Sequence, residues 1–413
     1  MQVKGSTRVA TEIEETRIDA TDLRVGMFVC RLDRPWESTP FPLQGIELRT
    51  DEDVRTLRDL CAWVYIDRHR EAVDHSHLLK SGARRSELRF TRVAHYTDQV
   101  SIEDELPNAQ AAFRTATQMV DLIYADVAGG RELSVELVER AVKPLVASVL
   151  RSADAFLYLE SMRRHDAYIY SHAISCSALA AAFGRHMGLH EDTVFSLAAG
   201  GLLMDVGKTR VPQELLQGPH PLSPEELEIV RAHIRHGVEI AADAGINDPD
   251  VLAVLRTHHE RHDGSGYPQR LQGGGIPVPG RMLGIIDSYD AMISARPYRA
   301  PVSRHRALQQ IYSGRDTLFQ SELVEQFQAC MGVYPTGSLV ELNSGEVAVV
   351  IMQNKARRLR PRVLLLTTPD KTPLSDFQPL DLLHQSIDGN SVEIVRSVAA
   401  GEYGIDTAGL LPQ

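Results

Sequence analysis

Apolar residues recur with a helical period through most of the chain between residues 107 and 330. They return every three or four positions in segments that begin near Ala111 and Ser134, and the stretches around His172 and before Asp205 are almost continuously apolar. One helical pattern follows another, and no strand pattern separates them. This part of the chain is therefore predicted to be an all-helical domain.

Two helices of this domain have clear start signals. Ser223-Pro224-Glu225-Glu226 combines a capping box with proline at the first helical position, and Asp248-Pro249 begins the next helix in the same manner. The first helix is predicted to carry His233. The second is predicted to place His258 and His259 at its C-terminal end.

The flanking segments have different patterns. Residues 1–20 are polar and predicted to be a mobile lead-in, whereas residues 21–68 combine strand patterns with one amphipathic helix, which indicates a small α/β module. Residues 69–106 are rich in charged and polar residues and are predicted to be a linker. Residues 331–413 contain SLVELN, GEVAVVIMQ and PRVLLLTTP separated by turns, which predicts a small β-rich unit and tail. The predicted fold class is mainly α, with the helical domain between these two smaller units.

Composition narrows the possible functions. The 413 residues include 44 Lys plus Arg against 55 Asp plus Glu, and the net charge of -11 argues against broad electrostatic binding to DNA or RNA. Four scattered cysteines without CxxC spacing indicate neither a disulfide framework nor a zinc knuckle. No stretch approaches the roughly 18 apolar residues of a membrane span, and the N-terminus lacks a signal-peptide core. We therefore expect a cytoplasmic protein that does not enter a membrane.

Reactive side chains are concentrated between His258 and Arg299. This run contains two adjacent histidines, a glycine-rich turn with Tyr267, the carboxylates of Asp287 and Asp290, and an Arg-Pro-Tyr-Arg cluster that begins at Arg296. A packed core has no need for that combination, although a solvated loop followed by an amphipathic helix would explain any one part of it.

Histidines and carboxylates on the other predicted helices complete a potential metal site. A lone histidine on an apolar face, such as His172, is ordinarily a core residue, but here other histidines and carboxylates occur on the neighbouring predicted helices. Imidazoles and carboxylates suit first-row metals such as Fe, Mn or Zn, and two close metal ions would clamp a phosphodiester and acidify a bound water. Lys208, Arg296 and Arg299 would neutralise phosphate oxygens. The candidate ligands are His172, Asp205, His233, His258, His259 and Asp287.

Residues from about 160 to 330 resemble an HD-GYP domain, the bacterial branch of the HD phosphohydrolases. Members of that family hydrolyse the second messenger cyclic di-GMP to pGpG or GMP with two, sometimes three, metal ions, often iron or manganese. The module at 21–68 is similar to one that often precedes such domains, on RVGMFVCRLDRPWESTPF and VYID, and would be accessory or regulatory. The matching elements are His172, Asp205-Val206-Gly207-Lys208, His233 with Gly237, His258-His259-Glu260, Asp263-Gly264-Ser265-Gly266-Tyr267-Pro268, Asp287-Ser288-Tyr289-Asp290 and RPYR.

The resemblance implies a role for each matching residue. Asp205 would bridge two divalent metal ions, and with Lys208 it would be catalytic. Histidines 233, 258 and 259 would complete one metal site, while His172 and Asp287 would serve the other. The phosphates and the rest of the ligand would be held by Lys208, Tyr267, Arg296 and Arg299.

One departure from the family pattern affects the second metal site. Met204 stands where the histidine of the His-Asp pair is expected. A thioether is a soft ligand and a poor match for Fe(II), Mn(II) or Mg(II), so the site of His172 and Asp287 is expected to be weak or empty.

Three further departures are milder. Tyr168 stands where trinuclear members have a glutamate, four residues before His172, so a third metal is not expected. His262 replaces the usual tryptophan, and Phe319-Gln320-Ser321 replaces Phe-Asp-Pro.

Two main functions remain open at this level. The first is a metal-dependent cyclic di-GMP phosphodiesterase with reduced activity. The second is a degenerate module that binds cyclic di-GMP, or a diguanylate cyclase with a GGDEF domain, without turnover. Hydrolysis of another nucleotide also remains open, because the ligand is inferred from resemblance. The helices of residues 107–160 are a candidate homodimer interface.

Overall fold

The computed structural model describes residues 15–34, 46–48, 51–67, 94, 96–161, 168–218, 221–294, 301–354, 359–383, 386–387, 390–399 and 401–405. The chain forms two compact units, which are described separately. The first comprises Met1–His95 with Ala356–Leu359, and the second comprises Tyr96–Lys355 with Arg360–Gln413.

The first unit is a small antiparallel sheet with one helix. Its strands are β1 (Glu15–Asp19), β2 (Phe28–Leu32), β3 (Ile46–Glu47) and β4 (Trp63–Asp67), in the order β1-β4-β2-β3, with α1 spanning Asp51–Leu60. Strand β1 lies within the predicted mobile lead-in. It is ordered because it pairs with β4 and because Ile18, opposite Val64, is buried in the core of this unit.

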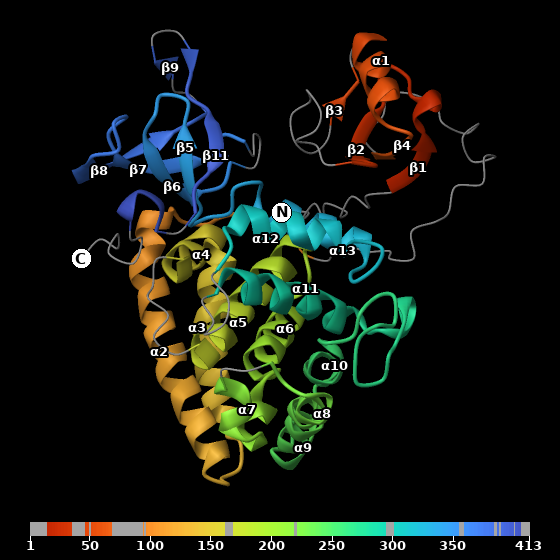
Figure 1. The fold of residues 1–413 in the computed structure, drawn as a ribbon, viewed down its shortest axis with the longest axis vertical. Helices are drawn as coiled ribbons and strands as arrows, with labels where there is room; N and C mark the ends of the chain where they lie inside the picture. The colour runs from red at the N-terminus through yellow and green to blue at the C-terminus, as the bar shows by residue number, and fades with distance from the viewer. Residues whose placement is uncertain are drawn as a thin grey trace, which may run out of the picture. The chain divides into compact units, whose positions relative to one another are not determined.

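Helices build most of the second unit, as the sequence pattern predicted (Figure 1). The first of them, α2, begins at Ile102, slightly before the predicted start of the domain. The helices are α2 (Ile102–Ala128), α3 (Val135–Arg151), α4 (Ala153–Ser161), α5 (Tyr168–His186), α6 (Glu191–Leu203), α7 (Gln213–Gln217), α8 (Pro224–Arg231), α9 (His233–Asp243), α10 (Pro249–Thr257), α11 (Val278–Ile293), α12 (Arg304–Ser313) and α13 (Ser321–Met331), with short 3-10 turns η5 (Val206–Arg210) and η6 (Gly273–Gly275).

The predicted helix starts are confirmed, but the helix that begins at Pro224 ends at Arg231, and the predicted position of His233 on it is wrong because His233 begins the next helix, α9. The Ser223 hydroxyl accepts a hydrogen bond from the Glu226 backbone N–H, and the Glu226 carboxylate accepts one from the Ser223 backbone N–H, so the capping box of α8 is complete. Asp248 caps α10, and Pro249 occupies its first turn. None of the described helices is both long and apolar enough to span a bilayer.

The predicted β-rich unit is a five-stranded antiparallel sheet packed against the helices. Its strands are β5 (Leu339–Leu342), β6 (Val347–Met352), β7 (Arg362–Thr367), β8 (Pro373–Asp381) and β11 (Ile394–Ser397), in the order β11-β5-β6-β7-β8. Tyr158 of α4 lies in a shared apolar cluster with Val347 and Leu366, and Asp154 accepts a hydrogen bond from the Thr336 hydroxyl. The fold is therefore mainly α with a small sheet at each end of the chain, as expected.

Two adjacent glycines set the spacing of three helices that carry candidate ligands. A Cβ on Gly201 of α6 would lie 2.9 Å from the carbonyl oxygen of Cys176, one turn after His172 on α5. A Cβ on Gly200 would lie 2.9 Å from the Val254 side chain, one turn before His258 on α10. Glycine thus lets α6 approach both helices closely and brings the residues that follow α6 near their ligands.

We expect Gly201→Ala to destabilise the protein, because its methyl group would press on backbone atoms that cannot move independently. Overpacking of this kind costs about 1–3 kcal/mol, measurable by urea unfolding, and should also weaken Mn(II) binding. The matched control is Gly274→Ala, at an exposed position where a Cβ meets nothing within 4 Å. Equal stability of the two variants would contradict the proposed spacing role.

Candidate metal centre

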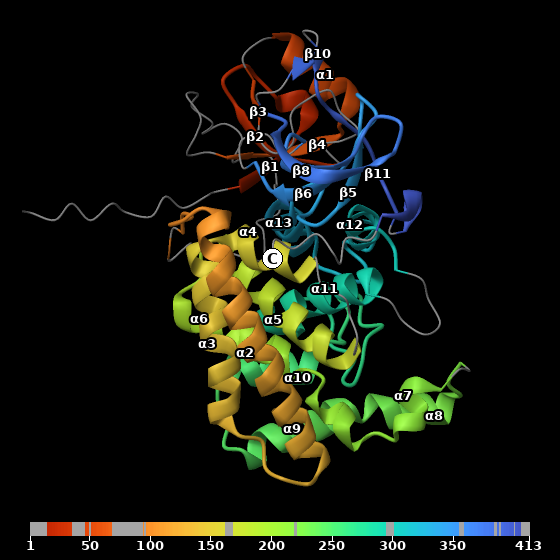
Figure 2. The same cartoon turned by 90° about the vertical axis from the view of Figure 1, so that its left-hand side faces the viewer.

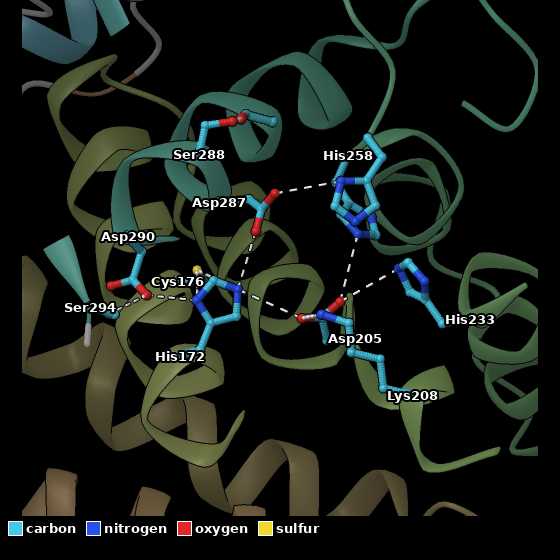
Figure 3. A network of polar contacts seen from close by, with 12 residues as sticks. His172, Cys176, Asp205, Lys208, His233, His258, Asp287, Ser288, Asp290 and Ser294 are labelled. Carbon is cyan, nitrogen blue, oxygen red and sulfur yellow. Dashed lines mark hydrogen bonds and ion pairs between the residues drawn. The ribbon is translucent and has the colours of Figure 1, made fainter. Parts of the chain in front are cut away.

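The candidate ligands converge from four helices and one turn. Asp205 follows α6, His172 lies in the second turn of α5, and His233 begins α9. His258 is the C-cap of α10, and Asp287 lies in the middle of α11. Figure 3 shows the Asp205 carboxylate between the His172 ring and the rings of His233 and His258.

Three acceptor atoms face one another without a hydrogen-bond partner among the described residues. Asp205 Oδ1 lies 3.6 Å from His233 Nε2 and 4.0 Å from His258 Nε2, and all three atoms are buried. The opposite nitrogens of the two rings face carbonyl oxygens, with His233 Nδ1 at 2.7 Å from that of Val230 and His258 Nδ1 at 3.0 Å from that of Val254. A carbonyl only accepts, so each ring carries its proton on Nδ1 and directs a lone pair from Nε2 toward Asp205.

This arrangement fits a metal ion. Buried polar atoms without partners cost free energy, and a cation at their point of convergence would satisfy all three. His259 offers a fourth ligand atom, and the ligand atoms of Asp205, His233, His258 and His259 all lie within 4.8 Å of one another. Imidazole nitrogens with one carboxylate oxygen are a normal donor set for a first-row divalent metal.

His172 lies in a second cluster on the other side of Asp205. Its Nε2 is 3.2 Å from Asp287 Oδ1 and 3.7 Å from Asp205 Oδ2, while its Nδ1 is 2.6 Å from Asp290 Oδ2. Asp287 also approaches His259, with 3.6 Å between Oδ2 and Nδ1. Asp290 is buried and fixes the orientation of the His172 ring, as carboxylates commonly do behind ligating histidines.

Sequence reasoning missed the role of Asp290. It was noted as one of two carboxylates in the run from His258 to Arg299 and as part of the Asp287-Ser288-Tyr289-Asp290 element, but without a role of its own. The available signal was its spacing: residues three apart on a helix share a face, so Asp290 follows Asp287 toward the same cluster.

The carboxylates of the centre are ionised. Burial acts to raise the pKa of Asp205, but Lys208, whose Nζ lies 2.6 Å from Asp205 Oδ2, and His233 outweigh burial and lower it. Burial likewise opposes ionisation of Asp287, yet contacts with His172 and His259 hold its pKa well below the ordinary value. Both groups are therefore in the form that binds a cation.

The imidazoles of the two clusters differ in protonation. Burial lowers the pKa of His233 to about 4 and also lowers those of His258 and His259. Burial acts in the same direction on His172, but its contacts with Asp287 and Asp290 raise its pKa well above the ordinary value. The first cluster is thus ready to bind a metal at neutral pH, whereas a metal must displace a proton from His172 in the second.

Cys176 lies beside His172 but is not reactive. Its Sγ is 3.6 Å from His172 Nδ1, and the side chain is fully buried. Burial raises the pKa of the thiol to about 12, so the sulfur stays protonated.

The glycine-rich loop places Tyr267 against the metal centre. The Tyr267 and His259 rings stack with centroids 4.7 Å apart and planes inclined by 27°. Gly264 has a positive φ of 82°, whereas Gly266 is needed for close approach, since a Cβ there would lie 2.4 Å from the Arg261 nitrogen. Gly264 therefore supplies a left-handed backbone conformation, and Gly266 supplies space.

Glu260 closes this loop, a role that sequence reasoning missed. Its buried carboxylate accepts backbone hydrogen bonds from Gln269, at 2.7 Å, and from Leu271, at 3.0 Å. These bonds connect the end of α10 to the segment that follows Tyr267.

The structure brings most of the predicted site residues together. Two of them, Arg296 and Arg299, are not among the described residues. Met204, at the end of α6, is buried at 1 % exposure. The side chain of Tyr168 also lies outside the described part of the chain. The residues brought together are His172, Asp205, Lys208, His233, His258, His259, Tyr267 and Asp287.

Comparisons with known proteins show which proteins this chain is similar to. An HD domain matches residues 147–323, a domain of unknown function matches 15–138, and a KOW domain associated with HD domains matches 339–404. A cyclic di-GMP phosphodiesterase of Pseudomonas aeruginosa is 32% identical over 374 residues, 89% of this chain and 88% of the relative. One from Thermotoga maritima is 35% identical over 165 residues, 39% of this chain and 44% of the relative. A 3'3'-cGAMP-specific phosphodiesterase of Vibrio cholerae is 29% identical over 312 residues, 75% of this chain and 52% of the relative.

The two clusters should differ in the pH dependence of metal binding. A group whose pKa is lowered carries no proton for a metal to displace, so Mn(II) affinity at the Asp205, His233 and His258 cluster should change less than about threefold between pH 7.5 and 5.5. Binding beside His172 should weaken about tenfold per pH unit as pH falls, because its raised pKa keeps it protonated. Isothermal titration with Mn(II) across this range measures both. A tenfold loss per unit at the tighter site would contradict the assignment.

We expect Glu260→Gln to loosen the loop without removing metal. The amide keeps one acceptor but turns an N–H₂ group toward the other backbone donor, and an unsatisfied buried donor costs about 1–3 kcal/mol. Urea unfolding measures this loss, with Glu225→Gln at an exposed position as control. Unchanged stability, or loss of bound Mn(II), would contradict a loop-closing role.

Proposed function

Since the chain belongs to the HD-GYP family of HD-domain phosphodiesterases, we propose that its metal centre hydrolyses cyclic di-GMP to pGpG or GMP in bacterial second-messenger signalling. The observation that carries this proposal is the convergence of Asp205 Oδ1 with the unpartnered Nε2 atoms of His233 and His258. The similarity to the Pseudomonas aeruginosa phosphodiesterase, which extends over 89% of this chain, supports the substrate.

The geometry supports a two-metal arrangement with Asp205 as the shared ligand. Its Oδ1 faces His233 and His258, and its Oδ2 lies 3.7 Å from His172 Nε2. One ion would be held by Asp205, His233, His258 and His259, and the other by Asp205, His172 and Asp287. The nitrogen and oxygen donors suit Fe(II) or Mn(II). Bound ions would polarise the phosphoryl group and acidify water for in-line attack.

Among the described residues, Lys208 is the cation best placed to contact the phosphate. Its ammonium group contacts Asp205 Oδ2 at 2.6 Å, yet its side chain remains 22% exposed. It can therefore hold the Asp205 carboxylate and donate to a non-bridging phosphate oxygen on the open side. Arg296, Arg299 and Tyr267 are proposed to contact the rest of the ligand.

Met204 is proposed to limit activity. The second cluster contains His172, Asp205 and Asp287, but the buried side chain at the position of the expected histidine is a thioether. A hard divalent ion there loses one suitable ligand, so this site should fill less readily than the first. With Tyr168 in place of a glutamate, a third metal is not expected.

Met204 also favours a second candidate function. A site that holds one metal and retains Lys208 can bind cyclic di-GMP without cleaving it, and would then act as a receptor or as a scaffold for GGDEF-containing diguanylate cyclases. Helices of residues 107–160 are proposed as a homodimer interface in either case. Turnover separates the two functions.

Restoring the histidine should separate them experimentally. Wild-type protein is expected to retain about one Mn(II) per chain and to form pGpG slowly, whereas Met204→His should retain two and react about tenfold faster or more, since losing even a residue that supports a metal ligand costs about 10–100-fold. Metal content by plasma mass spectrometry and pGpG by chromatography are the readouts. Met204→Leu, of similar size but without sulfur, should match the wild type. Absence of pGpG from a Met204→His protein with two bound metals would contradict the enzyme and favour the receptor.

A further inference from the structure

Arg231 is a cation beside the metal centre that the proposed mechanism does not use. It is the last residue of α8, two positions before His233. Helix α8 has no buried residue, and Figure 2 shows the α7–α8 segment extending from the helical body. The position of Arg231 is thus not explained by packing of its own helix.

The side chain of Arg231 contacts the tyrosine of the glycine-rich loop. Its Cζ lies 4.8 Å from the centroid of the Tyr267 ring, which in turn stacks on His259. Contacts of a guanidinium with a tyrosine ring are favourable and fix its plane. Arg231 is therefore separated from a proposed metal ligand by a single aromatic ring.

One edge of the guanidinium lacks an acceptor. Arg231 Nε is buried and has no hydrogen-bond partner among the described residues, whereas Nη1 donates to Glu228 Oε1 at 2.5 Å. The two side chains of this ion pair are 35% and 69% exposed, so the pair contributes little and can be displaced. Nη1 therefore already donates to one anionic oxygen, that of Glu228, and the Nε–H group remains as a donor for a second oxygen.

A cyclic dinucleotide has a group that matches these donors. It carries two phosphodiesters, and only one can be cleaved at the metal centre at a time. The other keeps its negative charge and needs a donor at a distance from the metals, where the fork of an arginine fits two phosphate oxygens. The Tyr267 ring provides that separation between Arg231 and His259.

We propose that Arg231 binds the phosphate of the cyclic dinucleotide that is not being cleaved, through Nε–H and the neighbouring Nη. This inference rests on the proposed function. It assigns Arg231 to substrate affinity rather than to bond cleavage, and it makes Glu228 a competitor for the same guanidinium.

The first test compares substrates with two phosphates and with one. Arg231→Gln in the Mn(II)-loaded full chain should raise KM for cyclic di-GMP about tenfold relative to KM for bis(p-nitrophenyl) phosphate, with kcat changed less than about twofold. The control is Arg235→Gln, four residues further on, where the side chain is 72% exposed and pairs with Glu239. If turnover is absent, Kd by titration replaces KM.

Glu228→Gln provides a readout that a structural role would not produce. It frees the guanidinium and should lower KM for cyclic di-GMP about twofold, the size of a weak exposed pair. In the Arg231→Gln background it should have no effect. Equal KM values for wild type and Arg231→Gln, or a loss of affinity with Glu228→Gln, would overturn the proposal.

A panel of cyclic dinucleotides separates failure of the proposed role of Arg231 from failure of the proposed function. If Arg231→Gln weakens the binding of cyclic di-GMP and 3'3'-cGAMP but not that of cyclic di-AMP, then Arg231 contacts guanine and the phosphate assignment is overturned. If the wild type accepts only cyclic di-AMP, the proposed substrate fails, while an unchanged affinity for that ring in Arg231→Gln would separately refute the role of Arg231. If no ring binds the wild type, both proposals fail.

Discussion

The centre of the structure depends on the electrostatic balance around Asp205. A buried carboxylate that directs one oxygen at two imidazole lone pairs is unfavourable without a cation, because none of these atoms can donate to another. Lys208 satisfies the other oxygen, which leaves the unpartnered atoms grouped on one side. A divalent ion there would stabilise the folded chain as well as supply the chemistry, so metal affinity and stability are linked.

Helix packing creates this balance from residues that are distant in sequence. The close contacts of Gly200 and Gly201 bring α6 against α10 and α5, and the carbonyls of Val230 and Val254 then hold two rings in the tautomer that points Nε2 inward. The same framework leaves the Lys208 side chain 22% exposed. The two histidine rings that face the metal site are thus held in place on a rigid support.

Much of this organisation could be predicted from the sequence, because it depends on local patterns. Apolar periodicity located the helices, and the caps at Ser223 and Asp248 located the starts of those that lead to His233 and His258. The contact of Lys208 with Asp205 is likewise local, because the two residues lie three apart at the 3-10 turn η5. Local signals of this kind survive folding because neighbouring residues stay close in any fold.

The parts that could not be predicted depend on long-range contacts. Nothing near Glu260 in the sequence indicates that it closes the Tyr267 loop, and the spacing of Asp290 from Asp287 indicates a shared helix face but not the contact with the His172 ring. Strand β1 was missed because its short ETRID pattern becomes a strand only by pairing with β4, far along the chain. The contact of Arg231 with Tyr267 has the same origin.

Anomalous diffraction from crystals grown with Mn(II) tests directly whether Asp205, His233 and His258 bind a metal ion. We expect a strong peak about 2.2 Å from Asp205 Oδ1 and from the Nε2 atoms of His233 and His258, which is the usual distance range for such ligands. A weaker peak, or none, is predicted beside His172 and Asp287. Absence of the first peak, or a stronger peak beside His172, would contradict the assignment of Asp205, His233 and His258 as the tighter metal site.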